Sequence, residues 1–162
     1  MEAAARATGA IDTVGTTGVC QVFPGAVNSV PSRCDLEIDV RDIDQDRRDA
    51  VLVRIEAACA DVATRRRVSV RVQVVNADPP ARCDAAVIDA LSASCVESGF
   101  ASEPMISRAY HDALFMSRVA PTAMLFIPCR DGVSHRPDEY AAPEDIARGV
   151  HVLALTLARL AR

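Results

Sequence analysis

Histidine is scarce in this 162-residue chain, which contains three, and aromatic residues make up only 4% of it, with no tryptophan. A metal cluster built mainly from imidazoles therefore has few candidate ligands, and stacking of nucleic-acid bases on aromatic side chains is not expected. Basic residues number 18 against 22 acidic residues, and they are scattered apart from the run Arg65–Arg67. The sequence therefore does not predict a nucleic-acid partner.

Long apolar runs are also absent, since the longest surrounds Met124–Ile127, far below the roughly 20 residues that a membrane helix needs. Glu2 and the lack of an apolar segment near the N-terminus argue against a signal peptide. No C-x-x-C, H-E-x-x-H or zinc-finger spacing occurs. We expect mostly free, buried thiols, although the even count also allows disulfides, at Cys20, Cys34, Cys59, Cys83, Cys95 and Cys129.

What is present is a globular composition, 50% hydrophobic and 25% charged, sufficient for one domain or two small ones. Val14–Phe23 is rich in Val and Thr and has a strand-like period. Alternating apolar positions predict half-buried strands over residues 36–40 and 68–74. Between them Asp44 can cap an amphipathic helix, so this part of the chain predicts a small α+β layer.

Two prolines at positions 79 and 80 follow Asp78 and predict a hinge. Beyond it, Asp84 can cap a helix that stops at Gly99, and Asp112 can cap a short helix through Arg118. The apolar run Thr122–Ile127 predicts a strand that a parallel sheet buries on both faces. The last helix begins at a proline and has one apolar stripe, formed by Ile146, Val150, Leu153, Leu157 and Leu160.

The predicted fold class is therefore α/β, in two parts. Residues 1–80 form the α+β module, and residues 81–162 form part of an α/β domain.

Three places are candidates for chemistry. His111 directly follows Tyr110 and precedes Asp112, so it can face a cleft, although Asp112 can equally be a plain helix cap. His135 lies in a flexible loop after the apolar run. It can be a metal ligand, or its side chain can simply be solvated. A third place combines an amide with a guanidinium.

That third place consists of Asn28, after the turn at Pro24–Gly25, and Arg41, at the end of a strand. A guanidinium can bind a carboxylate through two hydrogen bonds, and an amide can both donate to and accept from a ureido group. The structural alternatives are that Arg41 pairs with Asp39 or Asp42 and that Asn28 only serves the turn.

These pieces, in this order, resemble amidohydrolases of the M20 metallopeptidase clan that hydrolyse N-carbamoyl groups. The matching stretches of the family's lid domain are Thr13–Gly15, Pro24–Pro31 and Asp39–Asp42. Those of its C-terminal catalytic segment are Ala109–Ala113, Phe126–Cys129, Gly132–Pro137 and Pro143–Asp145. The bacterial allantoate and N-carbamoyl-amino-acid branches usually have Gly before the motif His, so Tyr110 makes the chain more similar to the plant branch that acts on ureidoglycolate.

The resemblance implies two divalent ions, typically manganese, a glutamate base, and hydrolysis of ureidoglycolate to glyoxylate, ammonia and carbon dioxide. Allantoate or an N-carbamoyl amino acid is the alternative substrate. His135 then corresponds to a metal ligand, Asn28 and Arg41 to lid residues that bind substrate across a homodimer interface, and Tyr110 and His111 to the substrate pocket. For the complete plant enzyme the resemblance also implies the endoplasmic reticulum.

The family's His-x-Asp and Glu-Glu motifs, which supply the general base and other metal ligands, do not occur in this sequence. We therefore expect residues 1–80 to be a partial lid and dimerisation domain, and residues 81–162 to be the C-terminal segment of the catalytic domain. No catalytic residue is assigned, and the isolated chain is expected to be inactive. The alternative is a non-catalytic fragment that binds a full-length subunit through the lid.

Overall fold

The computed structural model describes residues 1–161, and the chain divides into two compact units, Met1–Pro80 (unit 1) and Ala81–Arg162 (unit 2). Each unit is described by itself below. None of the helices within residues 1–161 is long and apolar enough to cross a membrane.

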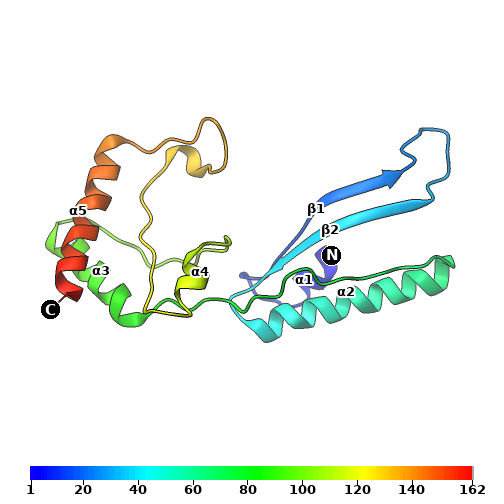
Figure 1. Ribbon diagram of the computed structural model, residues 1–162, viewed down its shortest axis with the longest axis horizontal. Coiled ribbons are helices and arrows are strands. Elements are labelled where there is room, and N and C mark those ends of the chain that lie inside the picture. Colours follow the sequence, from blue (N-terminus) through cyan, green and yellow to red (C-terminus); the bar gives the residue numbers. More distant parts are fainter. Residues whose placement is uncertain (162) are drawn as a thin grey trace. The chain divides into compact units, whose positions relative to one another are not determined.

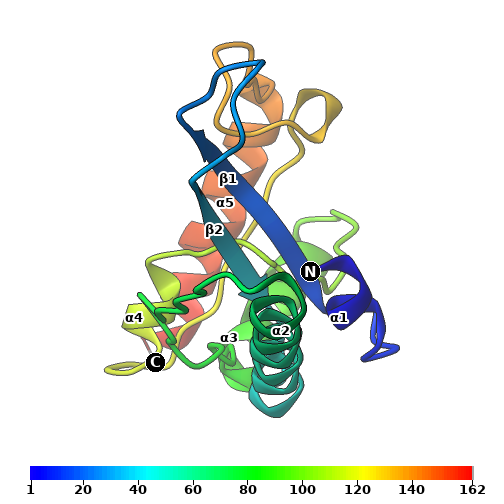
Figure 2. The same cartoon turned by 90° about the vertical axis from the view of Figure 1, so that its right-hand side faces the viewer.

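Unit 1 is an antiparallel hairpin with two helices packed against it (Figure 1). Its elements are α1 (Glu2–Arg6), β1 (Val14–Phe23), β2 (Arg33–Arg41) and α2 (Gln45–Arg66). The end-on view of Figure 2 shows α1 beside β1 and α2 beneath the hairpin. Gly15 permits the approach of α1, because a Cβ there would lie 2.7 Å from the Met1 sulfur.

The strand pairing leaves one residue of β1 out of register, between Thr17 and Val19. Gly18 therefore forms a bulge, which a residue without a side chain accommodates easily. Both strands were expected from the sequence, and β2 extends beyond the alternating residues 36–40 at each end.

The predicted cap of α2 is confirmed, since the Asp44 carboxylate accepts a hydrogen bond of 2.9 Å from the backbone N–H of Arg47. The helix ends at Arg66, and the C-cap residue Arg67 has the left-handed conformation with φ of 55°. Val51 on α2 is fully buried. A local sequence signal therefore determines the start of this helix.

Two predictions about strands and burial in unit 1 are wrong. Residues 68–74 form no strand, because in residues 1–161 the only ladder is the one between β1 and β2, and an extended segment needs a hydrogen-bonded neighbour to become a strand. The side chains expected to be half-buried are mostly exposed, with values of 54% for Leu36 and 41% for Ile38.

Unit 2 is mainly helical, with long connecting segments (Figure 1). Its elements are α3 (Ala85–Glu97), α4 (Ala113–Met116), the 3₁₀ turn η1 (Arg130–Gly132) and α5 (Pro143–Leu160). The Asp84 carboxylate caps α3 by accepting from the Val87 N–H at 3.1 Å, as predicted. Gly99, with φ of +73°, follows the end of this helix.

Where α3 and α5 pack together, the buried residues include two with hydroxyl groups, and Arg159 of α5 forms an ion pair with Glu97 of α3 at 2.6 Å. Ser94 is fully buried, and Thr156 is 2% exposed. Each buried hydroxyl donates to a carbonyl of its own helix, Ser94 to Ala90 at 2.9 Å and Thr156 to Val152 at 2.8 Å. Both polar groups are therefore satisfied without a partner across the interface, and each residue packs as a small side chain.

The apolar stripe of α5 is not the face that packs in unit 2. α5 packs through the face that contains Val152 and Thr156, and the expected apolar stripe is 47–62% exposed at all five positions. The predicted strand Thr122–Ile127 is also absent, since the described residues of unit 2 contain no strand that could pair with it. Leu125, Phe126 and Ile127 consequently remain 36–48% exposed.

The six cysteines are all free thiols, as expected from their spacing. Their burial differs from the prediction, because Cys95 is buried and Cys59 is intermediate, whereas Cys20, Cys34, Cys83 and Cys129 are exposed.

Candidate functional site

His111 lies in the segment that leads into α4. Two neighbours, Ser107 and Phe126, contact its ring, and a third, Phe115, contacts the ring of Tyr110. The Nε2 atom of His111 is 2.6 Å from the Ser107 hydroxyl, and the His111 ring lies 5.7 Å from the Phe126 ring. Tyr110 packs edge-on against Phe115, with ring centroids 5.8 Å apart. The two adjacent candidates therefore belong to one cluster of polar and aromatic side chains.

Ser107 is a site residue that the sequence interpretation missed. It lies four positions before His111, in a segment without regular structure, so no periodicity or motif marked it. When its hydroxyl donates to Nε2, the ring proton resides on Nδ1, which becomes a hydrogen-bond donor. When Nε2 carries the proton instead, it donates to the Ser107 hydroxyl, so the contact positions the His111 ring in either tautomer.

Asp112 precedes α4 but does not cap it with its side chain, contrary to the prediction. Its backbone is already helical, with φ of −59° and ψ of −26°, whereas side-chain capping needs an extended residue. The helix ends at Met116 and does not reach Arg118. A backbone bond from the Leu114 N–H to the His111 carbonyl, 3.0 Å long, closes the turn instead.

His135 lies in the loop after η1 and is exposed. Its backbone has the left-handed conformation, with φ of 58°, and its N–H donates to the Glu139 carboxylate at 2.8 Å. Within residues 1–161 no three His, Cys, Asp or Glu side chains form a group that could hold a metal ion. Since a hydrolytic metal site uses about three protein ligands and an open position, the described residues do not form one by themselves.

Arg41 is the last residue of β2, and its guanidinium forms two hydrogen bonds to Asp39. These join Nε to Oδ1 at 2.7 Å and Nη2 to Oδ2 at 3.0 Å. The hydrogen bonding to Asp39 raises the pKa of Arg41, against the opposing effect of partial burial, so the side chain stays charged. The structural alternative for Arg41, pairing with Asp39, is therefore present in the structure.

Asn28 is exposed in the turn that joins β1 to β2, at the opposite end of the hairpin from Arg41 (Figure 1). Eight residue steps separate the two ends of β2, a distance of about 26 Å at 3.3 Å per residue. The structure therefore does not bring Asn28 and Arg41 together within unit 1.

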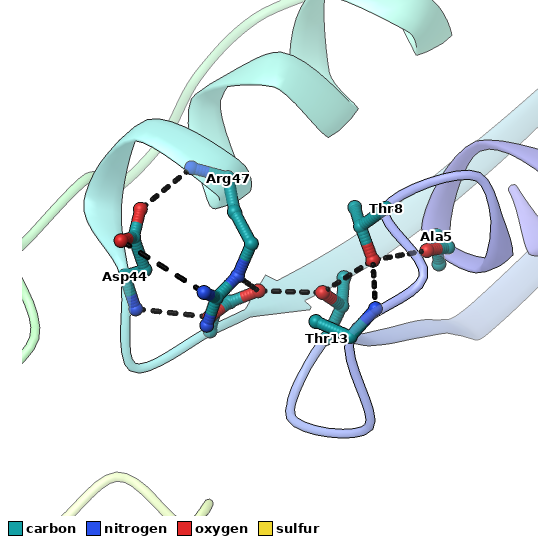
Figure 3. Close-up of polar contacts among 7 residues, drawn as sticks. Ala5, Thr8, Thr13, Asp44 and Arg47 are labelled. Carbon is teal, nitrogen blue, oxygen red and sulfur yellow. Dashed lines mark hydrogen bonds and ion pairs between the residues drawn. The ribbon is translucent and has the colours of Figure 1, made fainter.

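Asp42, the residue after Arg41, has a fully buried side chain and joins an ionic cluster with the partly exposed Arg47. Figure 3 labels three of its partners, Thr13, Asp44 and Arg47. Its carboxylate accepts from Arg47 at 2.6 and 3.2 Å, from the Thr13 hydroxyl at 2.5 Å and from the Asp44 N–H at 2.9 Å. Burial by itself would raise the pKa of Asp42, but the hydrogen bonds from Arg47, Thr13 and the Asp44 N–H outweigh it and lower the pKa to about 2. The cluster connects the end of β2, next to Arg41, to α2 through Arg47 and to the residue before β1 through Thr13.

Residues 4–159 match the model of Peptidase family M20/M25/M40, and the chain therefore belongs to this family. The predicted resemblance to the M20 amidohydrolases is confirmed, and the α/β fold class is consistent with it.

Several relatives are hydrolases of carbamoyl compounds. A ureidoglycolate hydrolase of Arabidopsis thaliana is 50% identical over 151 residues, which cover 93% of this chain and 32% of the relative. A ureidoglycolate hydrolase of Oryza sativa subsp. japonica is 49% identical, with coverage of 94% and 32%. An N-carbamoyl-L-amino-acid amidohydrolase of Pseudomonas sp. (strain NS671) is 35% identical, with coverage of 87% and 34%. The chain spans about a third of the length of these curated relatives.

Solved structures agree with this relationship. The crystal structure of AtUAH in complex with (S)-hydroxyglycine matches with a TM-score of 0.90 at 48% identity, covering 98% of this chain and 38% of that one. A hydantoinase/carbamoylase family amidase from Burkholderia vietnamiensis matches with a TM-score of 0.84 at 28% identity, covering 98% and 40%.

Proposed function

We propose that this chain provides the substrate-binding part of a ureidoglycolate amidohydrolase, which releases glyoxylate, ammonia and carbon dioxide. The observation that carries the proposal is the difference in identity among its relatives. Two ureidoglycolate hydrolases are 50% and 49% identical, whereas the N-carbamoyl-L-amino-acid amidohydrolase of Pseudomonas is 35% and the allantoate amidohydrolase of Bacillus subtilis is 32% identical.

His111 and Tyr110 would line the substrate pocket in this proposal. In the tautomer in which Ser107 donates to Nε2, His111 would offer an N–H donor at Nδ1 for the ureido or carboxylate oxygens. Tyr110, held by Phe115, presents a phenol where the allantoate and carbamoylase branches have glycine. The phenol occupies space next to the reacting group, which favours a small substrate over the longer allantoate.

Arg41 would bind the substrate carboxylate, because a guanidinium matches a carboxylate through two parallel hydrogen bonds. Related AtUAH structures contain the small carboxylates (S)-hydroxyglycine and glyoxylate. In this chain Asp39 already accepts from two Arg41 nitrogens, so the substrate must compete with it. Asp39 therefore sets how strongly Arg41 binds an acid.

Asn28 cannot share a small substrate with Arg41 of its own chain, since about 26 Å of strand separates the two ends of β2. A second copy, docked through the lid, would bring its Asn28 to the Arg41 end. We therefore include a lid-mediated homodimer in the proposed function.

His135 would be one ligand of the manganese pair that the resemblance implies. Because residues 1–161 contain no cluster of three ligands, this chain supplies part of the metal centre and does not hydrolyse ureidoglycolate on its own. The bound metal would activate the attacking water in the complete enzyme.

A chimera tests this proposal. The chain replaces the matching third of the Arabidopsis ureidoglycolate hydrolase, and ammonia release is measured with ureidoglycolate, allantoate and an N-carbamoyl amino acid. We expect turnover of ureidoglycolate by the chimera and none by the 162-residue chain alone. Tyr110→Gly is expected to shift the preference towards allantoate.

Variants of the same chimera separate the proposed roles. His135→Ala should lower bound manganese, with exposed His151→Ala as the matched control. Arg41→Lys should raise KM more than it lowers kcat, and Asp39→Asn should lower KM. A folded chimera that hydrolyses only carbamoyl amino acids, or turnover by the isolated chain, would contradict the proposal.

A further inference from the structure

Two exposed cysteines face each other across the hairpin of unit 1. The sulfur atoms of Cys20 on β1 and Cys34 on β2 are 3.9 Å apart, and both thiols are free. In the strand register Cys20 lies opposite Leu36, and Leu36 is two residues from Cys34. Side chains at these positions project from the same face, so the two thiols are diagonal neighbours on one surface.

The cysteines flank the Asn28 turn. Beyond them the hairpin is held by the last pair of β1 and β2, Phe23 opposite Arg33, whose guanidinium lies 4.0 Å from the Phe23 ring centre. The Ser32 N–H donates to the Phe23 carbonyl at 2.9 Å. A covalent link between the thiols would therefore close the loop at its base and restrict the residues between them.

We propose that Cys20 and Cys34 form a reversible disulfide by exchange with a low-molecular-weight disulfide, and that this bond restrains the turn containing Asn28. A disulfide needs the sulfurs about 2 Å apart, and diagonal neighbours on a sheet lie about 7–8 Å apart, so rotation about the Cα–Cβ bonds together with a small shift of the two strands must bring the sulfurs about 2 Å closer. The short separation and the exposure of both thiols make this pair the favoured product among the six cysteines.

The exchange is balanced. One cysteine thiolate attacks the reagent disulfide, forms a mixed disulfide and expels one reagent thiolate. The second cysteine thiolate attacks the cysteine sulfur of that mixed disulfide and expels the other. Two cysteine thiols are oxidised, one reagent disulfide is reduced to two thiols, and the two protons pass to the departing thiolates through water.

Partial loss of hydration, the hydrogen bond with Cys20 and the nearby Asp35 carboxylate raise the pKa of Cys34. The exchange is therefore expected to accelerate as the solution becomes more alkaline.

Tryptic mapping tests the pairing. The purified chain is incubated with oxidised glutathione, alkylated and digested. Because trypsin cleaves after Arg33, peptides 7–33 and 34–41 separate unless a disulfide joins them. We expect this joined pair to be the main disulfide product, to disappear after treatment with dithiothreitol, and to be absent from Cys20→Ser and Cys34→Ser. Cys129→Ser, which removes another exposed thiol, is the matched control and should leave the pair unchanged.

The same reaction in concentrated guanidinium gives the pairing of the unfolded chain. A native pairing no different from that control, or a main product involving Cys83 or Cys129, would overturn the proposal.

Amide hydrogen exchange of residues 24–32 tests the restraint. Exchange should slow severalfold in the oxidised form, and an unchanged rate in cross-linked protein would refute the effect on the turn. The meaning of this restraint for substrate binding rests on the proposed function. The disulfide itself is detected without ureidoglycolate, so failure of the pairing and failure of the proposed function are distinguishable.

Discussion

Replacement of Asp42 by asparagine should destabilise unit 1 strongly at neutral pH. The substitution keeps the size of the side chain but removes the negative charge opposite Arg47. With the pKa of Asp42 lowered to about 2, against about 3.9 in an unfolded chain, the ionised carboxylate contributes about 2 kcal/mol to the free energy of unfolding.

The pH dependence has a definite sign. Because the folded pKa lies below the unfolded one, the contribution is fully present above about pH 5 and disappears as the pH falls through about 2. Urea denaturation followed by circular dichroism at pH 7 and at pH 3 measures it. We expect the difference between the parent chain and Asp42→Asn to be about 2 kcal/mol at pH 7 and clearly smaller at pH 3.

Asp61→Asn is the matched control, since Asp61 forms an ion pair with Arg65 in which both side chains are 58% exposed. Such an exposed pair is worth a few tenths of a kcal/mol. Equal effects of the two substitutions, or a difference for Asp42→Asn that does not change between pH 7 and pH 3, would refute the electrostatic reasoning.

Three further predictions concern single positions. Gly149→Ala should destabilise unit 2 by about 1 kcal/mol, because the new Cβ would lie 2.6 Å from Cγ2 of Ile127. In an Ile127→Ala background the same change should stabilise unit 2, because only the higher helix propensity of alanine then remains, and thermal unfolding of both pairs of variants checks this. Arg67→Gly should raise the free energy of unfolding of unit 1 by about 0.5 kcal/mol, since glycine adopts φ of 55° without strain; urea titration would disprove this if the variant were less stable. Ser107→Ala should change the nitrogen chemical shifts of the His111 ring, because Nε2 loses its hydrogen-bond partner, and an unaltered spectrum would contradict the proposed positioning.

The starts of α2, α3 and α5 could be predicted because their signals are local, whereas the expected side-chain cap of α4 by Asp112 does not form. Asp44 and Asp84 each accept the N–H three residues ahead, and Pro143 begins α5, so a few consecutive residues determine each of these starts. Burial could not be predicted in the same way, since an apolar stripe such as that of α5 indicates what the helix can cover but not whether a neighbour is present.

The same distinction applies to strands and to the site. β1 and β2 are consecutive in the chain and pair with each other across the loop of residues 24–32. Residues 68–74 and Thr122–Ile127, in contrast, would need partner strands that residues 1–161 do not provide. The motif around His111 could be identified because its residues are adjacent in the sequence. Its contact with Ser107 arises from an irregular loop conformation, which periodicity does not encode.

The contact between α3 and α5 implies two kinds of tolerance to mutation on one helix. At Thr156, which is 2% exposed, residues larger than threonine add volume to a filled interface, so they should be rejected for size, whatever their polarity. Along the exposed stripe of α5, side-chain size is unconstrained, and the polarity of the new side chain decides whether a substitution is tolerated. In a saturation library of α5, side-chain volume would therefore decide which substitutions are tolerated at the buried positions, and side-chain polarity would decide it at the exposed positions. The positions where one rule gives way to the other would mark the edge of the contact with α3.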